Sequence, residues 1–308
     1  MGEKVSVTKR IGGRLTAAAA MAFLLFAPAW AEARTGAAPP NPAIWLLADE
    51  DTRIYLFGTV HILPHDLVWR SEALERVIAE ADELVLEIGE EPAADEAAAL
   101  FAPMMMDKSV SILGRVSPAR RAALREMIAA SGLPIELYDR MHSWGAAFML
   151  VGASFREAYA DPNAPEAPLT GVEDSLRVDF ERDNRPISGV ESVETQLGFF
   201  DAMPLGEQRA FLESTIDAYL SEEAVFDPEE AGWVRGDVES IGAEMEALPP
   251  ALFERLITRR NAAWTEWLVE RLRRPGTVLF AVGAGHLAGR DSVQSMLAGR
   301  GLRANRLP

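Results

Sequence analysis

The sequence predicts an α/β fold with a central mixed, mainly parallel sheet, flanking helices and a large helical insertion. Short apolar runs that close in glycine alternate with longer segments of helical periodicity. A strand–helix–strand order early in the chain implies a right-handed parallel crossover. In contrast, residues 92–165 carry mostly helical patterns. Together these features indicate one sheet that is interrupted by a helical block.

The first elements are a β-hairpin and a strand–helix–strand unit. Ala43–Ala48 and Arg53–Phe57 are apolar runs on either side of an acidic turn. Ser71 is the expected N-cap of a helix that ends at Ala81, with apolar residues on one face. Glu83–Gly89 is then the next strand.

The predicted insertion covers about residues 92–165 and lies over the sheet. Its helical patterns are Pro92–Met106, Ser117–Ser131 and Ile135–Tyr159. We interpret its methionines as core filler or the lining of a lid, rather than a cofactor site. His142, inside the third pattern, is expected to be structural.

The second half alternates again between helical and strand patterns after a Pro-rich loop at 161–170. The expected elements, in order, are a helix at Asp174–Asp183, a strand at Pro186–Glu191, helices at Val193–Met203, Leu205–Leu220, Gly232–Leu248 and Ala251–Arg273, a strand that opens Thr277–Ala288, a short helix from Asp291 to Gly299, and an edge strand at Leu302–Arg306.

The N-terminus has the organisation of a secretory signal peptide. Four basic residues precede the apolar stretch Leu15–Pro28, and Ala29-Trp30-Ala31 is a typical cleavage site. The apolar stretch is shorter than a spanning helix needs, so an uncleaved anchor is the weaker interpretation. We expect a signal peptide at 1–31, a linker at 32–43 and a single domain at 44–308, periplasmic or secreted, with no membrane span after cleavage.

Charge and cysteine content exclude several classes of partner and site. Cleavage would remove four basic residues and one acidic residue, so the formal net charge would fall from −17 to −20. Such a charge opposes binding to nucleic acid and to anionic membranes. The sequence has no Cys, which excludes disulfides and thiolate metal sites.

Two similar motifs suggest the functional site. Gly58–His61 and Gly283–His286 both place Gly-x-x-His at the end of an apolar run. Two other predicted strands deliver carboxylates, Glu87 and Glu191, to their ends. Because ligands bind at the carboxyl edge of open α/β sheets, we expect these four side chains to meet there.

This residue set is compatible with two chemistries, and the spacing does not decide between them. His61, Glu87, Glu191 and His286 could ligate a catalytic Mn, Co, Zn or Fe ion that lowers the pKa of a bound water. Arg260 would then hold a carbonyl oxygen or developing oxyanion. Alternatively, a histidine oriented by a glutamate activates water without a metal.

Other motifs are absent or misplaced. Gly283-x-Gly285-x-x-Ala288 formally fits the dinucleotide fingerprint, but that fingerprint normally opens a Rossmann domain, and a His within it would crowd the pyrophosphate. We therefore expect no nucleotide cofactor. The sequence has no G-x-S-x-G elbow, so a serine hydrolase mechanism has no support.

Several short segments, in order along about residues 44 to 308, carry a family resemblance. They are Leu56–His61, Ala81–Glu87, Gly189–Glu191 with Gln196-Leu197, Trp233 with Gly236-Asp237, Arg260-Asn261 with Trp264, and Ala281–Leu287. In these segments the chain resembles the TraB/GumN family, which is sometimes grouped with the Tiki metalloproteases. The resemblance implies an α/β fold similar to that of erythromycin-esterase-like proteins. It also implies a hydrolase site of two His, a Glu and an Arg, divalent-metal-dependent as in Tiki-like members.

We therefore predict an exported, divalent-metal-dependent hydrolase that cuts a peptide or ester-like bond of a peptide, small molecule or envelope component. The expected catalytic residues are His61, Glu87, Arg260 and His286, and either Glu191 or Glu173 adds a ligand or base. The alternative is a non-catalytic periplasmic protein that sequesters a peptide or envelope component in the same pocket. The residues expected to support the site are Gly58, Glu173, Asn261, Gly283 and Gly285.

Overall fold

The computed structural model describes residues 39–64, 66–90, 102–106, 108–161, 163–164, 167–220 and 232–308. The predicted signal peptide, most of the linker and the first part of the Pro92–Met106 helix lie outside these ranges. Within them, no helix is both long enough and apolar enough to cross a bilayer.

A six-stranded mixed sheet forms the centre of the fold, and this confirms the predicted α/β class. The strand order is β4-β3-β5-β2-β1-β6. β2, β5, β3 and β4 run parallel, whereas β1 is antiparallel to both of its neighbours. The strands are β1 (Ile44–Ala48), β2 (Thr52–Thr59), β3 (Glu83–Ile88), β4 (Ile187–Glu191), β5 (Gly276–Gly283) and β6 (Asn305–Arg306).

The last long strand, β5, lies between the two strands of the early β-α-β unit. It pairs with β2 in a register that places Gly58 opposite Val282 and Thr59 opposite Gly283. On its other side, Ala281 pairs with Leu86 of β3. The two Gly-x-x-His motifs therefore leave neighbouring parallel strands at the same edge of the sheet.

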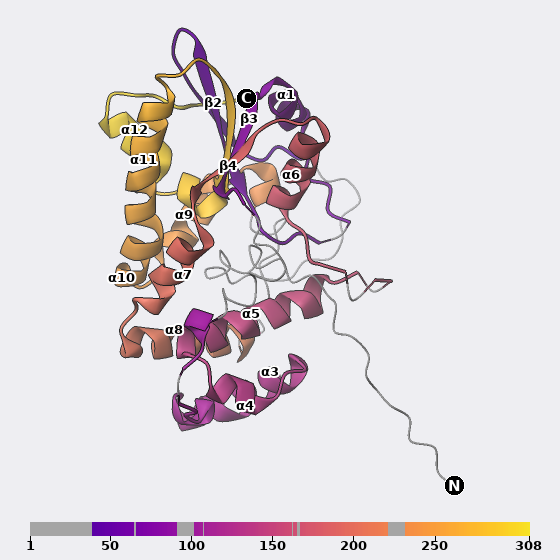
Figure 1. Ribbon diagram of the computed structural model, residues 1–308, viewed down its shortest axis with the longest axis vertical. Helices are drawn as coiled ribbons and strands as arrows, with labels where there is room; N and C mark the ends of the chain where they lie inside the picture. Colours follow the sequence, from indigo (N-terminus) through magenta and orange to yellow (C-terminus); the bar gives the residue numbers. More distant parts are fainter. Residues whose placement is uncertain are drawn as a thin grey trace.

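Helices cover both faces of the sheet (Figure 1). α1 (Glu72–Glu80) and α6 (Val172–Arg182) bury apolar side chains against one face. α11 (Arg259–Arg271) and α12 (Val293–Gly299) cover the other, where Trp264 and Leu268 contact strand residues. Burial of these apolar faces fixes the helices that approach the carboxyl edge.

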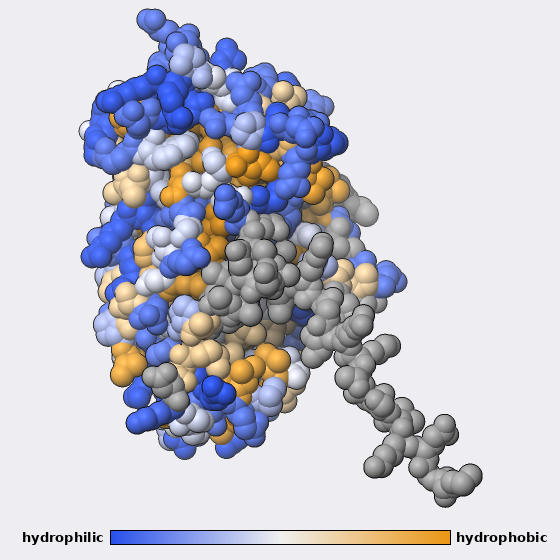
Figure 2. All heavy atoms as spheres, viewed as in Figure 1, coloured by the Kyte–Doolittle hydropathy of each residue, from blue (hydrophilic) through white to orange (hydrophobic). Residues whose placement is uncertain are grey.

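Five further helices form a separate core at one end of the described part of the molecule (Figure 1). Polar and charged side chains instead dominate the opposite end, which carries the β1–β2 hairpin (Figure 2). The insertion predicted at 92–165 supplies α3, α4 and α5 to this second core, but its boundaries stay a prediction. The helices of this core are α3 (Arg121–Ala130), α4 (Ile135–Asp139), α5 (Ser143–Tyr159), α7 (Val193–Asp201) and α8 (Leu205–Leu220), with short 3₁₀ turns η2 (Ala102–Met104), η3 (Ile112–Gly114) and η4 (Pro118–Arg120).

The predicted helix Ile135–Tyr159 is interrupted. Met106 and His142 donate backbone hydrogen bonds to Arg140 and Met104, so 104–106 and 140–142 form a short antiparallel bridge between α4 and α5. His142 is the residue before α5, so the prediction that it lies inside a helix was wrong.

The predicted helices Gly232–Leu248 and Ala251–Arg273 are also divided. Gly236 adopts a left-handed conformation (φ 69°), which separates the 3₁₀ turn η5 (Trp233–Arg235) from α9 (Val238–Glu246). The second segment consists of α10 (Pro250–Phe253), a π-helical turn η6 (Glu254–Thr258) and α11. π-helical turns often occur at functional sites, and this one directly precedes α11, whose second residue is Arg260.

Candidate functional site

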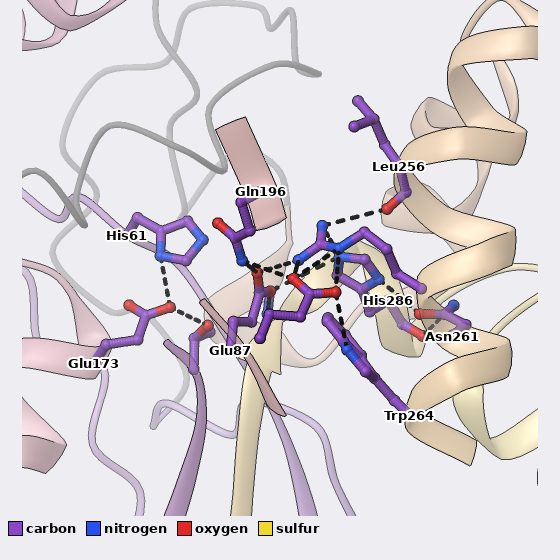
Figure 3. Close-up of polar contacts among 12 residues, drawn as sticks. His61, Glu87, Glu173, Gln196, Leu256, Asn261, Trp264 and His286 are labelled. Atoms are coloured by element: carbon purple, nitrogen blue, oxygen red, sulfur yellow. Dashed lines mark hydrogen bonds and ion pairs between the residues drawn. The ribbon is translucent and has the colours of Figure 1, made fainter. Parts of the chain in front are cut away.

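Histidines from the two ends of the domain meet at the carboxyl edge of the sheet (Figure 3). His61 follows β2, and His286 lies in the 3₁₀ turn η7 (Ala284–Leu287) that follows β5. A Cβ atom added at Gly283 would lie 3.8 Å from Nε2 of His61, 3.5 Å from Cδ2 of His286 and 3.1 Å from Oε1 of Glu87. The structure therefore brings together the three side chains that the sequence placed at separate strand ends.

Glycines permit this close approach. A Cβ at Gly58 would lie 3.0 Å from the Cα of Ala284, so the two motifs contact each other through their backbones. A Cβ at Gly171 would overlap the backbone carbonyl of His61. Gly285 similarly has no space for a Cβ, because the side chain of Met245 fills it.

His61 lies against the carboxylate of Glu173. Its Nδ1 lies 2.6 Å from Oε1 of Glu173, which also accepts a hydrogen bond from the hydroxyl of Thr59. Because a carboxylate only accepts, Nδ1 carries the proton and Nε2 is the basic nitrogen of the neutral ring. Burial alone would lower the pKa of His61, but the nearby Glu173 and Glu87 carboxylates outweigh burial and raise it above the ordinary value.

His286 is held differently, although its motif is the same. The amide nitrogen of Asn261 donates to the backbone oxygens of His286 and Asp291, so its oxygen faces Nδ1 of His286 at 2.6 Å. Nδ1 must therefore donate. Nε2 accepts from Nη1 of Arg260 at 3.0 Å, which makes the ring neutral. Burial, aided by the Arg260 charge, lowers the pKa of His286 to about 3.

Arg260 binds both predicted carboxylates. Its Nη2 lies 2.5 Å from Oε2 of Glu87 and 2.8 Å from Oε2 of Glu191, and its Nε donates to both oxygens of Glu191. Nη1 donates to His286 and, at 3.3 Å, to the carbonyl of Leu256 in the π-helical turn. Every N–H group of the guanidinium thus has an acceptor.

Neutral donors complete the cluster. Gln196 donates through Nε2 to Oε2 of Glu87 and of Glu191, both at 2.9 Å. The indole of Trp264 donates to Glu191 and lies against His286, with ring centroids 4.3 Å apart. Burial would raise the pKa of Glu87, but Arg260 and the two histidines lower it well below its usual range.

Sequence comparison finds relatives of this chain. The profile of the TraB/PrgY/gumN family matches residues 43–306. The chain belongs to this family. It is 21% identical over 263 residues to proteins named YbaP, described as uncharacterized, from Escherichia coli (strain K12) and Shigella flexneri. The alignments cover 83% of this chain and 92% of each relative. No solved structure matches the chain significantly.

The predicted metal ligands of this TraB/PrgY/gumN chain do not fit a divalent ion as they stand. Within the described ranges, no group of three or more His, Asp or Glu side chains has the spacing of a metal site. The reason is that the Arg260 guanidinium already engages Glu87, Glu191 and Nε2 of His286. A divalent ion at these donors would have to share or displace their contacts with Arg260, and metal dependence stays a prediction.

Two site residues of this family member were missed or undervalued in the sequence. Thr59 had no signal beyond being a polar residue inside an apolar strand. Gln196 lies in the first turn of α7, just after the strand that carries Glu191, and only its place in the resemblance pointed to it. Both are buried, and both donate to site carboxylates.

Proposed function

We propose that this TraB/PrgY/gumN chain is a hydrolase that cuts a peptide or ester-like bond, with His61 as the general base and Glu173 as its orienting partner. Family membership makes no statement about the reaction, so the proposal rests on the site. The observation that supports the proposal is that His61 and His286, which share the Gly-x-x-His motif, have different hydrogen-bond partners and opposite pKa shifts. Environments that push apart the pKa values of paired titratable groups are typical of acid–base sites.

The contrast assigns different roles to the two rings. The Glu173 and Glu87 carboxylates raise the pKa of His61 against the effect of burial, so its ring takes up a proton more readily than the ring of His286. The pKa of His286 is lowered to about 3, and both of its nitrogens are engaged. We therefore assign the acid–base role to His61 and a positioning role to His286.

The proposed reaction moves one proton through His61. Nε2 takes a proton from water while the water oxygen bonds to the substrate carbonyl carbon, and Glu173 stabilises the imidazolium that forms. The imidazolium then returns the proton to the leaving nitrogen or oxygen as the carbon–leaving-group bond breaks. Glu173 thus fixes the ring orientation and the site of the proton.

Arg260 has a more restricted role than the sequence suggested. Stabilising an oxyanion would require one of its N–H groups to leave a present acceptor, and the longest of these bonds is the 3.3 Å contact with Leu256. In the arrangement observed, Arg260 instead pairs with Glu87 and Glu191. Its use as an oxyanion donor stays a prediction.

We also propose that the protein is exported after cleavage at Ala31 and acts on a peptide or envelope component in the periplasm or outside the cell. The support is the n-region, apolar stretch and A-x-A pattern of residues 1–31. N-terminal sequencing of the protein recovered from a periplasmic fraction tests this directly. An N-terminus at Met1 in a membrane fraction would contradict it.

The test of the reaction is cleavage of a peptide and ester library by mature protein, by His61→Gln and by His142→Gln as a control outside the site. We expect His61→Gln to lose at least about a hundredfold in kcat/KM while its circular dichroism is unchanged, and His142→Gln to retain activity. Wild-type turnover equal to that of His61→Gln would overturn the assignment. Saturable binding without turnover would support the non-catalytic alternative.

The same assay separates the two chemistries. After dialysis against EDTA, the metal-free route predicts unchanged turnover. Loss of activity on EDTA treatment, with recovery on adding Mn²⁺ or Co²⁺, would instead establish the metal-dependent route.

A further inference from the structure

The site around His61 carries an excess of negative charge. Glu87, Glu173 and Glu191 each contribute a formal −1, and Arg260 returns only +1. His286 adds nothing, since it is neutral. The formal sum is therefore −2 when His61 is neutral and −1 when it is protonated.

This excess is buried. The side chains of Glu87, Glu191 and Glu173 are only 6%, 7% and 18% exposed. Gln196 and Trp264 offer dipoles to Glu87 and Glu191 but no charge. Because an incompletely compensated buried charge is costly, such a site favours the arrival of a further cation and opposes an anion.

Glu173 indicates where that cation would bind. One oxygen, Oε1, accepts from both Thr59 and His61, whereas Oε2 is buried and has no hydrogen-bond partner among the described residues. A carboxylate oxygen is an acceptor only, so a ligand that satisfies it must bring an N–H or O–H group. An ammonium or guanidinium supplies both the donor and the missing charge.

Arg260 has no N–H group available to bind an anion in the arrangement observed. Each N–H of Arg260 already has a carboxylate, imidazole or carbonyl acceptor. A phosphate, sulfate or carboxylate on the substrate would therefore meet three carboxylates and no available guanidinium donor in the part of the site that the structure describes.

We propose that the substrate presents a positively charged group beside His61 and Glu173, so that the site selects cationic peptides over anionic ones. This inference rests on the proposed function, because it concerns the substrate of that site. The charged group is an α-ammonium or a basic side chain, which share the same recognition chemistry. The acidic net charge of the chain, −17, acts in the same direction at longer range.

The experiment measures binding to the inert His61→Gln protein, so that it does not depend on turnover. Fluorescent peptides of one sequence would carry Lys, Gln or Glu at a single central position, each with a free or an acetylated N-terminus. We expect the Lys peptide to bind about tenfold more tightly than the Gln peptide, and the Glu peptide more weakly still. A tenfold preference that depends only on the free N-terminus would identify the α-ammonium as the charged group.

Two further variants separate the site from the acidic surface. Glu173→Gln, made in the His61→Gln protein, is expected to abolish the preference for Lys over Gln. Glu270→Gln removes the same charge from an exposed position (68% exposed) paired with Arg273, and it should leave the preference intact. Should Glu173→Gln not fold, Glu191→Gln tests the same charge balance.

The outcomes are distinguishable. Equal affinities for all peptides, or a preference that Glu270→Gln removes as effectively as Glu173→Gln, would overturn the inference. Turnover by the wild-type protein without charge preference would also overturn it and leave the proposed hydrolase intact. A charge preference without turnover would support the inference while the proposed hydrolysis fails.

Discussion

Replacing Arg260 by Met is expected to lower the free energy of unfolding by about 3–5 kcal/mol, the range for removing one partner of a buried ion pair. Arg260 is 8% exposed and lies 2.5 Å from Glu87 and 2.8 Å from Glu191. Without it, two carboxylates bridged by Gln196 would face each other with no adjacent guanidinium. Methionine keeps an unbranched apolar side chain, so the lost packing is small by comparison.

A double-mutant cycle isolates the charge from the packing. Glu87→Gln removes one of the two carboxylates, so Arg260→Met should cost less in that background, by about 1–3 kcal/mol. Arg300→Met is the matched control, because its ion pair with Glu266 is about half exposed (53% and 57%). Exposed ion pairs contribute little to stability, so this change should have little effect.

Urea unfolding at pH 7, followed by tryptophan fluorescence, measures these differences directly. The reasoning is wrong if Arg260→Met costs no more than Arg300→Met, or if its cost is the same with Glu87 and with Gln at that position. Either result would mean that Arg260 is not the internal counter-ion of the carboxylates, and the case against a divalent ion at these donors would be lost.

Three other perturbations test neighbouring contacts. Asn261→Ala should destabilise the fold by about 1–3 kcal/mol, because Nδ1 of His286 and two backbone oxygens lose their partner. The ¹⁵N chemical shifts of His286 should also show that it leaves the Nδ1–H tautomer, and an unchanged tautomer would refute the role given to Asn261. The free energy of unfolding should fall as pH decreases from 6.5 towards 3, by up to about 1.4 kcal/mol per pH unit, because His286 takes up a proton in the unfolded chain but not in the native state, where its pKa is about 3. His286→Gln should flatten this slope between pH 7 and 5, and an equally steep slope in the variant would contradict the assignment. Gly171→Ala should lower the free energy of unfolding by about 1–3 kcal/mol, because the new Cβ would overlap the carbonyl of His61. Gly206→Ala is the control for the same unfolding measurement, since a Cβ there meets nothing within 4 Å.

The main strands and several helices could be predicted because their signals are local. The runs that became β2, β3 and β5 are apolar, short and closed by glycine or by a carboxylate. Ser71 caps α1 as expected, since its side chain accepts from the backbone of Leu74. The helix breaks were not predicted, because the bridge at Met105–Met141 and the π-helical turn before Arg260 depend on contacts made by other segments.

The sequence by itself determined which residues would reach the carboxyl edge of the sheet. His61, Glu87, Glu191 and His286 each lie at or near a strand end, and parallel strands bring such ends together. The chain composition likewise excluded disulfides and thiolate metal sites before any fold was known.

Only the tertiary structure decided what those residues do to one another. Two identical Gly-x-x-His motifs cannot be told apart by sequence, yet Glu173 raises the pKa of one histidine while burial and Arg260 lower that of the other. The physical reason is that a pKa depends on charges and burial within a few ångströms. Glu173, which acts on His61, comes from α6, and Arg260, which acts on His286, comes from α11; both helices lie more than a hundred positions from His61 along the chain.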